Sequence, residues 1–75
     1  MTYKELMDKA HRHFDPERKG IIKGYPVGVL FCISRMADAK GWDQQVDEVP
    51  LRERLTKSET LDKNCVAAVL GLLGG

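Results

Sequence analysis

The apolar residues near the beginning of the chain have the spacing of an amphipathic helix. Thr2 followed by Glu5 is the pattern of a capping box, in which the two side chains bond to backbone N–H groups that a helix start leaves free. On the charged segment that follows, apolar residues recur at helical spacing, at Tyr3, Leu6, Met7, Ala10 and Phe14. We therefore expect a helix over residues 2–14 and a turn in the sequence DPERKG directly after it.

A longer apolar segment follows this turn and predicts a second helix over residues 26–40. Pro26 suits the first position of a helix, and Gly41 suits a stop directly after Lys40. The residues VGVLFCI at 27–33 also fit a buried strand, so helix and strand are both open for them. The continuation SRMADAK consists of helix-forming residues without a turn signal, and this length favours the helix.

Two shorter helices are expected in the second half of the chain. Two leucines four residues apart, with charged residues between them, indicate a helix over residues 49–57. Ser58 or Asp62 can cap a last helix over residues 59–73. The fold class is therefore all-α, as a small bundle of three to four helices.

The chain has 75 residues and shows no repeat, low-complexity run or linker. We interpret residues 1–75 as one helical domain. A domain of this size buries a small share of its chain surface, so its margin of stability is thin. A partner subunit would help to stabilise it.

The second and the last helix carry more apolar residues than one buried stripe requires. On the second helix, one face consists of Val27, Leu30, Phe31 and Ala37. Apolar residues at i, i+4 and i+7 form a further face on the second helix, namely Val29, Ile33 and Met36. The last helix has the same spacing at Val66, Leu70 and Leu73, and we refer to these six residues together as the further face. The first and the third helix offer too little surface to cover all the apolar residues of the second and the last helix, unless the fold covers these two helices more completely than the spacing suggests.

Exposed apolar patches usually mark interaction sites. The sequence therefore predicts a small non-catalytic protein–protein interaction module, with that further face as its docking surface and a homodimer as its expected state. A regulator, an adaptor or an inhibitor, including one from a phage or another mobile element, would fit this description.

The charge balance favours neither nucleic acid nor an anionic membrane, because twelve basic and eleven acidic side chains leave a net charge of +1. The distribution is uneven: residues 1–40 carry eight basic and five acidic groups, and residues 41–75 carry four and six. The most site-like polar feature is a basic group that could contact phosphates or an acidic protein surface. It consists of Lys9, Arg12, Arg18, Lys19 and Lys23. Nucleic-acid binding by segment 9–23 is therefore the alternative function.

The chain lacks the residue patterns of known catalytic and metal sites. Cys32 and Cys65 lie in apolar runs, which indicates buried, reduced thiols that are neither nucleophiles nor a disulfide. His11 and His13 are two residues apart and point to different sides of a helix, so they lack the spacing of zinc ligands. DPERKGIIKGYP aligns with a calcium loop, but a lysine and a proline stand where oxygen ligands belong. We expect no enzymatic activity, no catalytic residue, no cofactor and no metal.

The terminal Gly-Gly resembles the reactive tail of ubiquitin-like and sulfur-carrier proteins. The preceding residues, VAAVLGLL, follow helical spacing instead of the alternation of a β-rich carrier, so we interpret the glycines as a helix end. No apolar stretch has the length of a signal peptide or a membrane span. The sequence therefore predicts a soluble cytoplasmic protein without a membrane partner.

Overall fold

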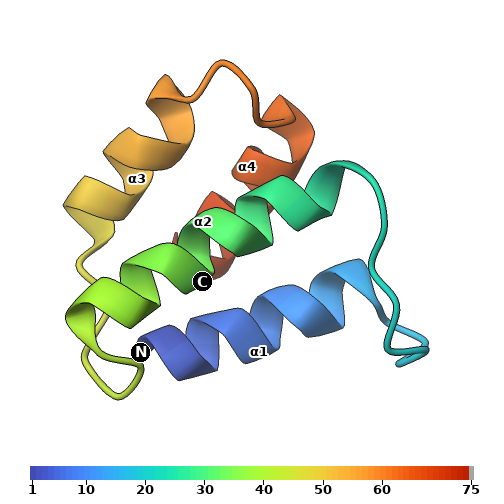
Figure 1. Cartoon of the computed structure of the whole chain (residues 1–75), viewed down its shortest axis with the longest axis horizontal. Coiled ribbons are helices and arrows are strands. Elements are labelled where there is room, and N and C mark those ends of the chain that lie inside the picture. The colour runs from blue at the N-terminus through green and yellow to red at the C-terminus, as the bar shows by residue number, and fades with distance from the viewer. Residues whose placement is uncertain (75) are drawn as a thin grey trace.

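The chain folds into α-helices, and the all-α prediction is confirmed (Figure 1). The structure is a computed structural model that describes residues 1–74. The helices are α1 (Tyr3–Phe14), α2 (Tyr25–Lys40), α3 (Glu48–Lys57) and α4 (Lys63–Gly74). Residues 27–33 belong to α2, so the alternative of a buried strand is wrong. Within residues 1–74, no helix combines the length and the apolar character that a membrane span requires.

The capping box expected at the start of α1 is present. The N–H of Glu5 donates to Oγ1 of Thr2 at 3.2 Å, and the N–H of Thr2 donates to Oε1 of Glu5 at 3.1 Å. This backbone bond from Thr2 is the main reason why the pKa of Glu5 lies below its ordinary value. The capping box therefore stabilises the fold above the ordinary carboxyl pKa, and this stabilisation is lost as the pH falls through the lowered pKa of Glu5.

The last helix begins later than the sequence suggests, because Asp62 and not Ser58 caps it. The Oδ2 atom of Asp62 accepts the N–H of Cys65 at 3.0 Å, in the first turn of α4. Ser58 instead follows the last residue of α3 in an extended conformation. Residues 58–62 are the connection between α3 and α4, so the predicted start at residue 59 is wrong.

α1 begins against the connection between α2 and α3, which passes close to the N-terminus (Figure 1). The N–H of Tyr3 donates to the carbonyl of Gln44 at 3.1 Å, and the N–H of Lys4 donates to the carbonyl of Trp42 at 3.0 Å. Backbone N–H groups in the first turn of a helix have no partner within the helix. A distant part of the chain satisfies two of them here and fixes the position of α1.

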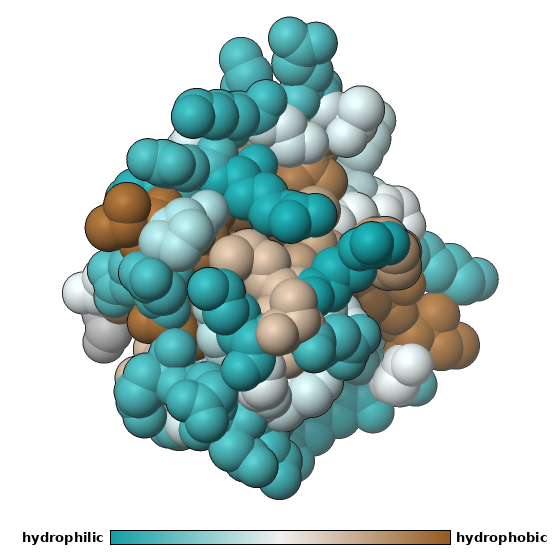
Figure 2. Space-filling view, turned by 60° about the vertical axis from the view of Figure 1, so that its left-hand side comes forward, coloured by the Kyte–Doolittle hydropathy of each residue, from teal (hydrophilic) through white to brown (hydrophobic). Residues whose placement is uncertain are grey.

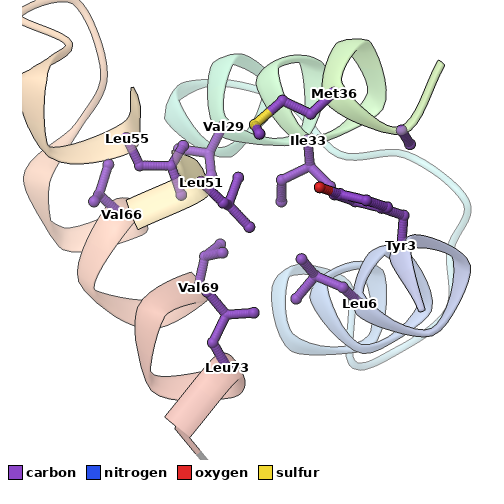
Figure 3. Packing of buried hydrophobic residues seen from close by; sticks show 11 residues of the cluster. Tyr3, Leu6, Val29, Ile33, Met36, Leu51, Leu55, Val66, Val69 and Leu73 are labelled. Atoms are coloured by element: carbon purple, nitrogen blue, oxygen red, sulfur yellow. The ribbon is translucent and has the colours of Figure 1, made fainter. Parts of the chain in front are cut away.

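α2 and α4 form the centre of the fold, since each of them contacts all three other helices. α1 and α3, both of which are described in full, do not contact each other. Figure 3 shows that buried side chains from all four helices point toward one another. The buried cluster consists of Tyr3, Leu6, Val29, Ile33, Met36, Ala37, Leu51, Leu55, Val66, Val69 and Leu73.

The apolar face that the sequence assigns to docking lies in this core, so the expectation that it stays uncovered is wrong. Five of its six residues are buried, namely Val29, Ile33, Met36, Val66 and Leu73, and Leu70 is half-buried against the cluster. The physical reason is that α2 and α4 cover each other. Two helices with broad apolar faces therefore need less surface from α1 and α3 than either would need alone.

Tyr3 is fully buried, and its hydroxyl has no hydrogen-bond partner among residues 1–74. A buried hydroxyl without a partner costs about 1–3 kcal/mol of desolvation. We expect Tyr3→Phe to raise the free energy of unfolding by about 1 kcal/mol, measured by urea unfolding. Leu6→Ala, which opens a cavity in the same core, should lower it by about 2–5 kcal/mol. A loss of stability in Tyr3→Phe would contradict this interpretation, because it would show that the hydroxyl is bonded.

Two glycines should respond to alanine in opposite directions. Gly71 lies within α4 with open space where a Cβ would stand, so Gly71→Ala should raise the free energy of unfolding by about 1 kcal/mol. Gly41 ends α2 with φ +109°, and a Cβ there would lie 3.0 Å from Cγ of Gln44. Gly41→Ala should therefore lower it by about 1–3 kcal/mol. Thermal unfolding measures both, and midpoints that shift in the same direction would show that one of the two backbone conformations is wrong.

Candidate protein-docking groove

Three large apolar side chains on α2 remain exposed, Tyr25 at its first residue and then Val27 and Phe31, whereas Leu30 and Ala37 are buried. Val27 keeps 47% of its surface and Phe31 keeps 60%. They are four residues apart and share one side of the helix, opposite the side of Ile33. Figure 2 shows another side of the molecule, where hydrophobic residues form separate patches among hydrophilic ones.

Val27 and Phe31 belong to the α1–α2 groove, a depression of about 440 Å³ between α1, α2 and the loop that joins them. Its apolar lining is completed by Met7, Ile22, Leu30 and Trp42. A second depression, the side hollow, has about 470 Å³ and shares Met7, His11 and Trp42 with the groove. Because they share these three residues, the two depressions adjoin each other along α1 and are together called the concave surface.

The loop between α1 and α2 is folded by one carboxylate. The side chain of Asp15 accepts the N–H of Lys19 at 3.0 Å and the N–H of Gly20 at 2.8 Å. The chain reverses here through left-handed residues, with φ +54° at Arg18 and φ +77° at Gly20. This closed turn brings Ile22 to the groove.

The basic residues predicted as an anion site are all exposed, but they do not form one cluster of free cations. Nζ of Lys19 lies 2.8 Å from Glu17, and the guanidinium of Arg12 lies 3.1 Å from Asp8. Lys9, Arg18 and Lys23 have no ion pair within residues 1–74. Arg12 and Arg18 line a polar recess of about 280 Å³ beside the groove, which is also lined by Asp8 and Asp15.

The acidic and basic side chains of residues 1–40 differ in how the fold uses them. All five acidic side chains are engaged within the chain: Glu5 with Thr2, Asp8 with Arg12, Asp15 with two backbone N–H groups, Glu17 with Lys19, and Asp38 with the indole N–H of Trp42. Among the eight basic side chains only Arg12 and Lys19 are ion-paired in the described part of the chain. The exposed cations of this half are therefore available to an external anion.

His11, Asp15 and Ser34 line the same groove, which are the residue types of a catalytic triad. The hydrogen bonds described for residues 1–74 do not join them, and both oxygens of Asp15 accept backbone N–H groups. Burial, together with Asp62, raises the pKa of the Cys65 thiol, which disfavours the thiolate that a nucleophile needs. Within residues 1–74, no group of three or more His, Cys, Asp or Glu side chains is arranged to hold a metal ion.

Searches against protein-family models, curated proteins and solved structures return no match. The candidate site therefore rests on the geometry of this chain. Gly75, on which the carrier interpretation of the Gly-Gly tail depends, lies outside the described residues.

Sequence reasoning missed Phe31 and Val27 as exposed residues, although a signal was present. Arg35 follows Phe31 by four residues, and its guanidinium carbon lies 5.7 Å from the centre of the Phe31 ring. A charged residue in the same row as Val27 and Phe31 indicates the solvent side of a helix. The row of Val29, Ile33 and Met36 carries a charge only at Lys40, the last residue of the helix.

Asp15→Ala tests whether the carboxylate holds the loop. Loss of its two bonds should make the amide hydrogens of Lys19 and Gly20 exchange about tenfold faster, because bonds to a charged acceptor contribute about 1.5–3 kcal/mol. NMR-detected hydrogen exchange measures this. Glu17→Ala is the control, since Glu17 forms only an exposed ion pair in the same loop. Equal exchange rates in wild type and Asp15→Ala would contradict the assigned role.

Proposed function

We propose that this chain is a non-catalytic protein–protein interaction module that docks a partner in the α1–α2 groove. The observation that carries this proposal is the exposure of Phe31, 60%, at the mouth of an apolar depression. A protein of this size has few apolar side chains to spare from its core. Large apolar side chains beside a concave surface are typical of interaction sites.

The absence of catalysis is part of the proposal and is supported by the chemistry of the candidate groups. The raised pKa of Cys65 disfavours nucleophilic attack by its thiol. His11 and Asp15 share the groove without a bond that would orient the imidazole as a base. What the groove offers is apolar contact area bordered by cations, which suits binding better than chemistry.

The residues first assigned to a homodimer contact are largely buried in the core of one chain, so they cannot form that contact. At ~200 Å² for an aromatic side chain, the exposed part of Phe31 amounts to roughly 120 Å². A stable interface of either kind buries about 800 Å² on each partner, so the rest of the groove lining must contribute contact area. We propose a different protein as the partner, because two copies that meet through Phe31 would bring like charges such as Arg35 together, and treat self-association as the competing outcome.

Nucleic-acid binding by segment 9–23 is the second candidate function. It is supported by Lys9, Arg18 and Lys23, which are exposed and have no ion pair in the described residues. Contacts of this kind with phosphates weaken steeply as the salt concentration rises. Duplex DNA at two salt concentrations therefore belongs in the same test.

Phe31→Asp should abolish capture of the partner from a lysate of the source cell, because it places a charge at the centre of the groove. Val49→Asp is the matched control, since Val49 is 66% exposed and lies on α3, away from the groove. We expect wild type and Val49→Asp to retain the same protein and Phe31→Asp to lose at least ~90% of it. Circular dichroism checks that all three proteins are folded.

Equal capture by Phe31→Asp and Val49→Asp would contradict docking in the groove. A wild-type protein that is dimeric at micromolar concentration and becomes monomeric in Phe31→Asp would support self-association instead. Tight binding of duplex DNA that weakens with salt, together with no retained protein, would favour the second candidate.

A further inference from the structure

The chemistry of the partner can be inferred from the charge around the groove, and this inference rests on the proposed docking function. Four exposed cations without an ion pair in residues 1–74 lie on or beside the concave surface. Lys4 lines the side hollow, Arg18 lines the polar recess, Lys23 follows Ile22 in the loop, and Arg35 lies over Phe31.

The acidic residues nearby do not offset this by presenting free carboxylates to a ligand. Asp15 lines the groove, but both of its oxygens accept N–H groups of the loop. Glu5 and Asp8 line the side hollow, where Glu5 is bonded to Thr2 and Asp8 is paired with Arg12, and Asp38 accepts the indole N–H of Trp42 at 2.9 Å. A bound anionic group would therefore meet cations without an ion pair, whereas a bound cation would have to share carboxylates that already accept hydrogen bonds or form an ion pair.

A second copy of this chain is a poor occupant on the same grounds. In a symmetric dimer, both subunits contribute the same patch. Two copies facing each other through Phe31 would bring Arg35, Lys23 and Arg18 against the same cations of the other subunit. Like charges at an interface oppose association.

Nucleic acid could pair with the cations but would leave the apolar side chains of the groove without a partner. Val27 and Phe31 line the groove and would gain little from contact with a phosphate backbone. A helix with apolar residues on one side and carboxylates on its flanks matches both features. A helix of about 10–12 Å diameter can lie against an open depression between two helices.

We propose that the α1–α2 groove holds an acidic amphipathic helix of a partner protein. Apolar side chains of this helix contact Phe31, Val27 and Ile22. Carboxylates on its flanks pair with the exposed cations beside the groove, namely Arg35, Lys23 and Arg18.

The chain contains its own reporter for this binding. Trp42 is the single tryptophan, and it lines both the groove and the side hollow. The probe is a synthetic helical peptide of about four turns with leucines at i, i+4 and i+7 and glutamates on both flanks. The matched probe has lysine at every glutamate position. Titration of each peptide into the whole protein, followed by tryptophan fluorescence, measures its affinity.

We expect the glutamate peptide to bind at least ~10-fold more tightly than the lysine peptide, and its affinity to fall as salt is added. Phe31→Asp should weaken it by about tenfold or more, and Val49→Asp should leave it unchanged. Arg35→Glu, an exposed substitution that leaves the core intact, should reduce the preference for the glutamate peptide by about tenfold. This variant keeps the test informative if Phe31→Asp fails to fold.

Equal affinity for the two peptides, no fluorescence change with either, or an unchanged preference in Arg35→Glu would each overturn the proposal. Displacement of the glutamate peptide by duplex DNA at low salt, with tighter binding of the DNA, would overturn it in favour of nucleic acid. If Phe31→Asp still loses the captured cell protein while the glutamate peptide does not bind, the groove is a docking site for a partner of different chemistry. The failure of this inference is thereby distinguished from a failure of the proposed function.

Discussion

The burial of one side of α2 against the three other helices is the contact on which the rest of the structure depends. Val29 and Ile33 are completely covered on this side, and they meet residues from α1, α3 and α4 in one cluster (Figure 3). Since α2 and α4 cover each other, their broad apolar faces are largely satisfied within the chain. The opposite side of α2 is then left to solvent, and it carries Phe31. The core and the candidate docking groove are therefore two consequences of the same packing.

The groove exists because α1 is fixed at both ends beside α2. At its start, carbonyls of Trp42 and Gln44 take backbone N–H groups of α1. At its end, the carboxylate of Asp15 closes the loop that returns the chain to α2. α1 and the loop are consequently held beside α2 by hydrogen bonds at both ends of α1, and such a preformed surface loses little conformational entropy when a partner binds.

Local features of the sequence were sufficient to predict most of the helices. The capping box at Thr2 and the glycine after Lys40 act within one helical turn, so their effect can be predicted without the rest of the fold. The buried face of α2 could not be predicted in this way, because its partner α4 is distant in the sequence and covers residues that looked unpartnered. The cations of the loop were correctly expected at the surface, whereas the apolar residues of the site were assigned to the wrong side of α2. Arg35, four residues after Phe31, was a local indication of the exposed side, whereas the cover that α4 provides could not be predicted from it.

The central claim is that α2 keeps Ile33 inside and Phe31 outside, and a comparison of unfolding free energies for Ile33→Ser and Phe31→Ser tests it most directly. Ile33 is 0% exposed, so its replacement should lower the free energy of unfolding by about 3–5 kcal/mol. Phe31 lies largely in solvent, so its replacement should change the value by no more than about 0.5 kcal/mol. The reverse order, with Phe31→Ser the more damaging of the two, would show that the other side of α2 forms the core and would contradict the groove as described.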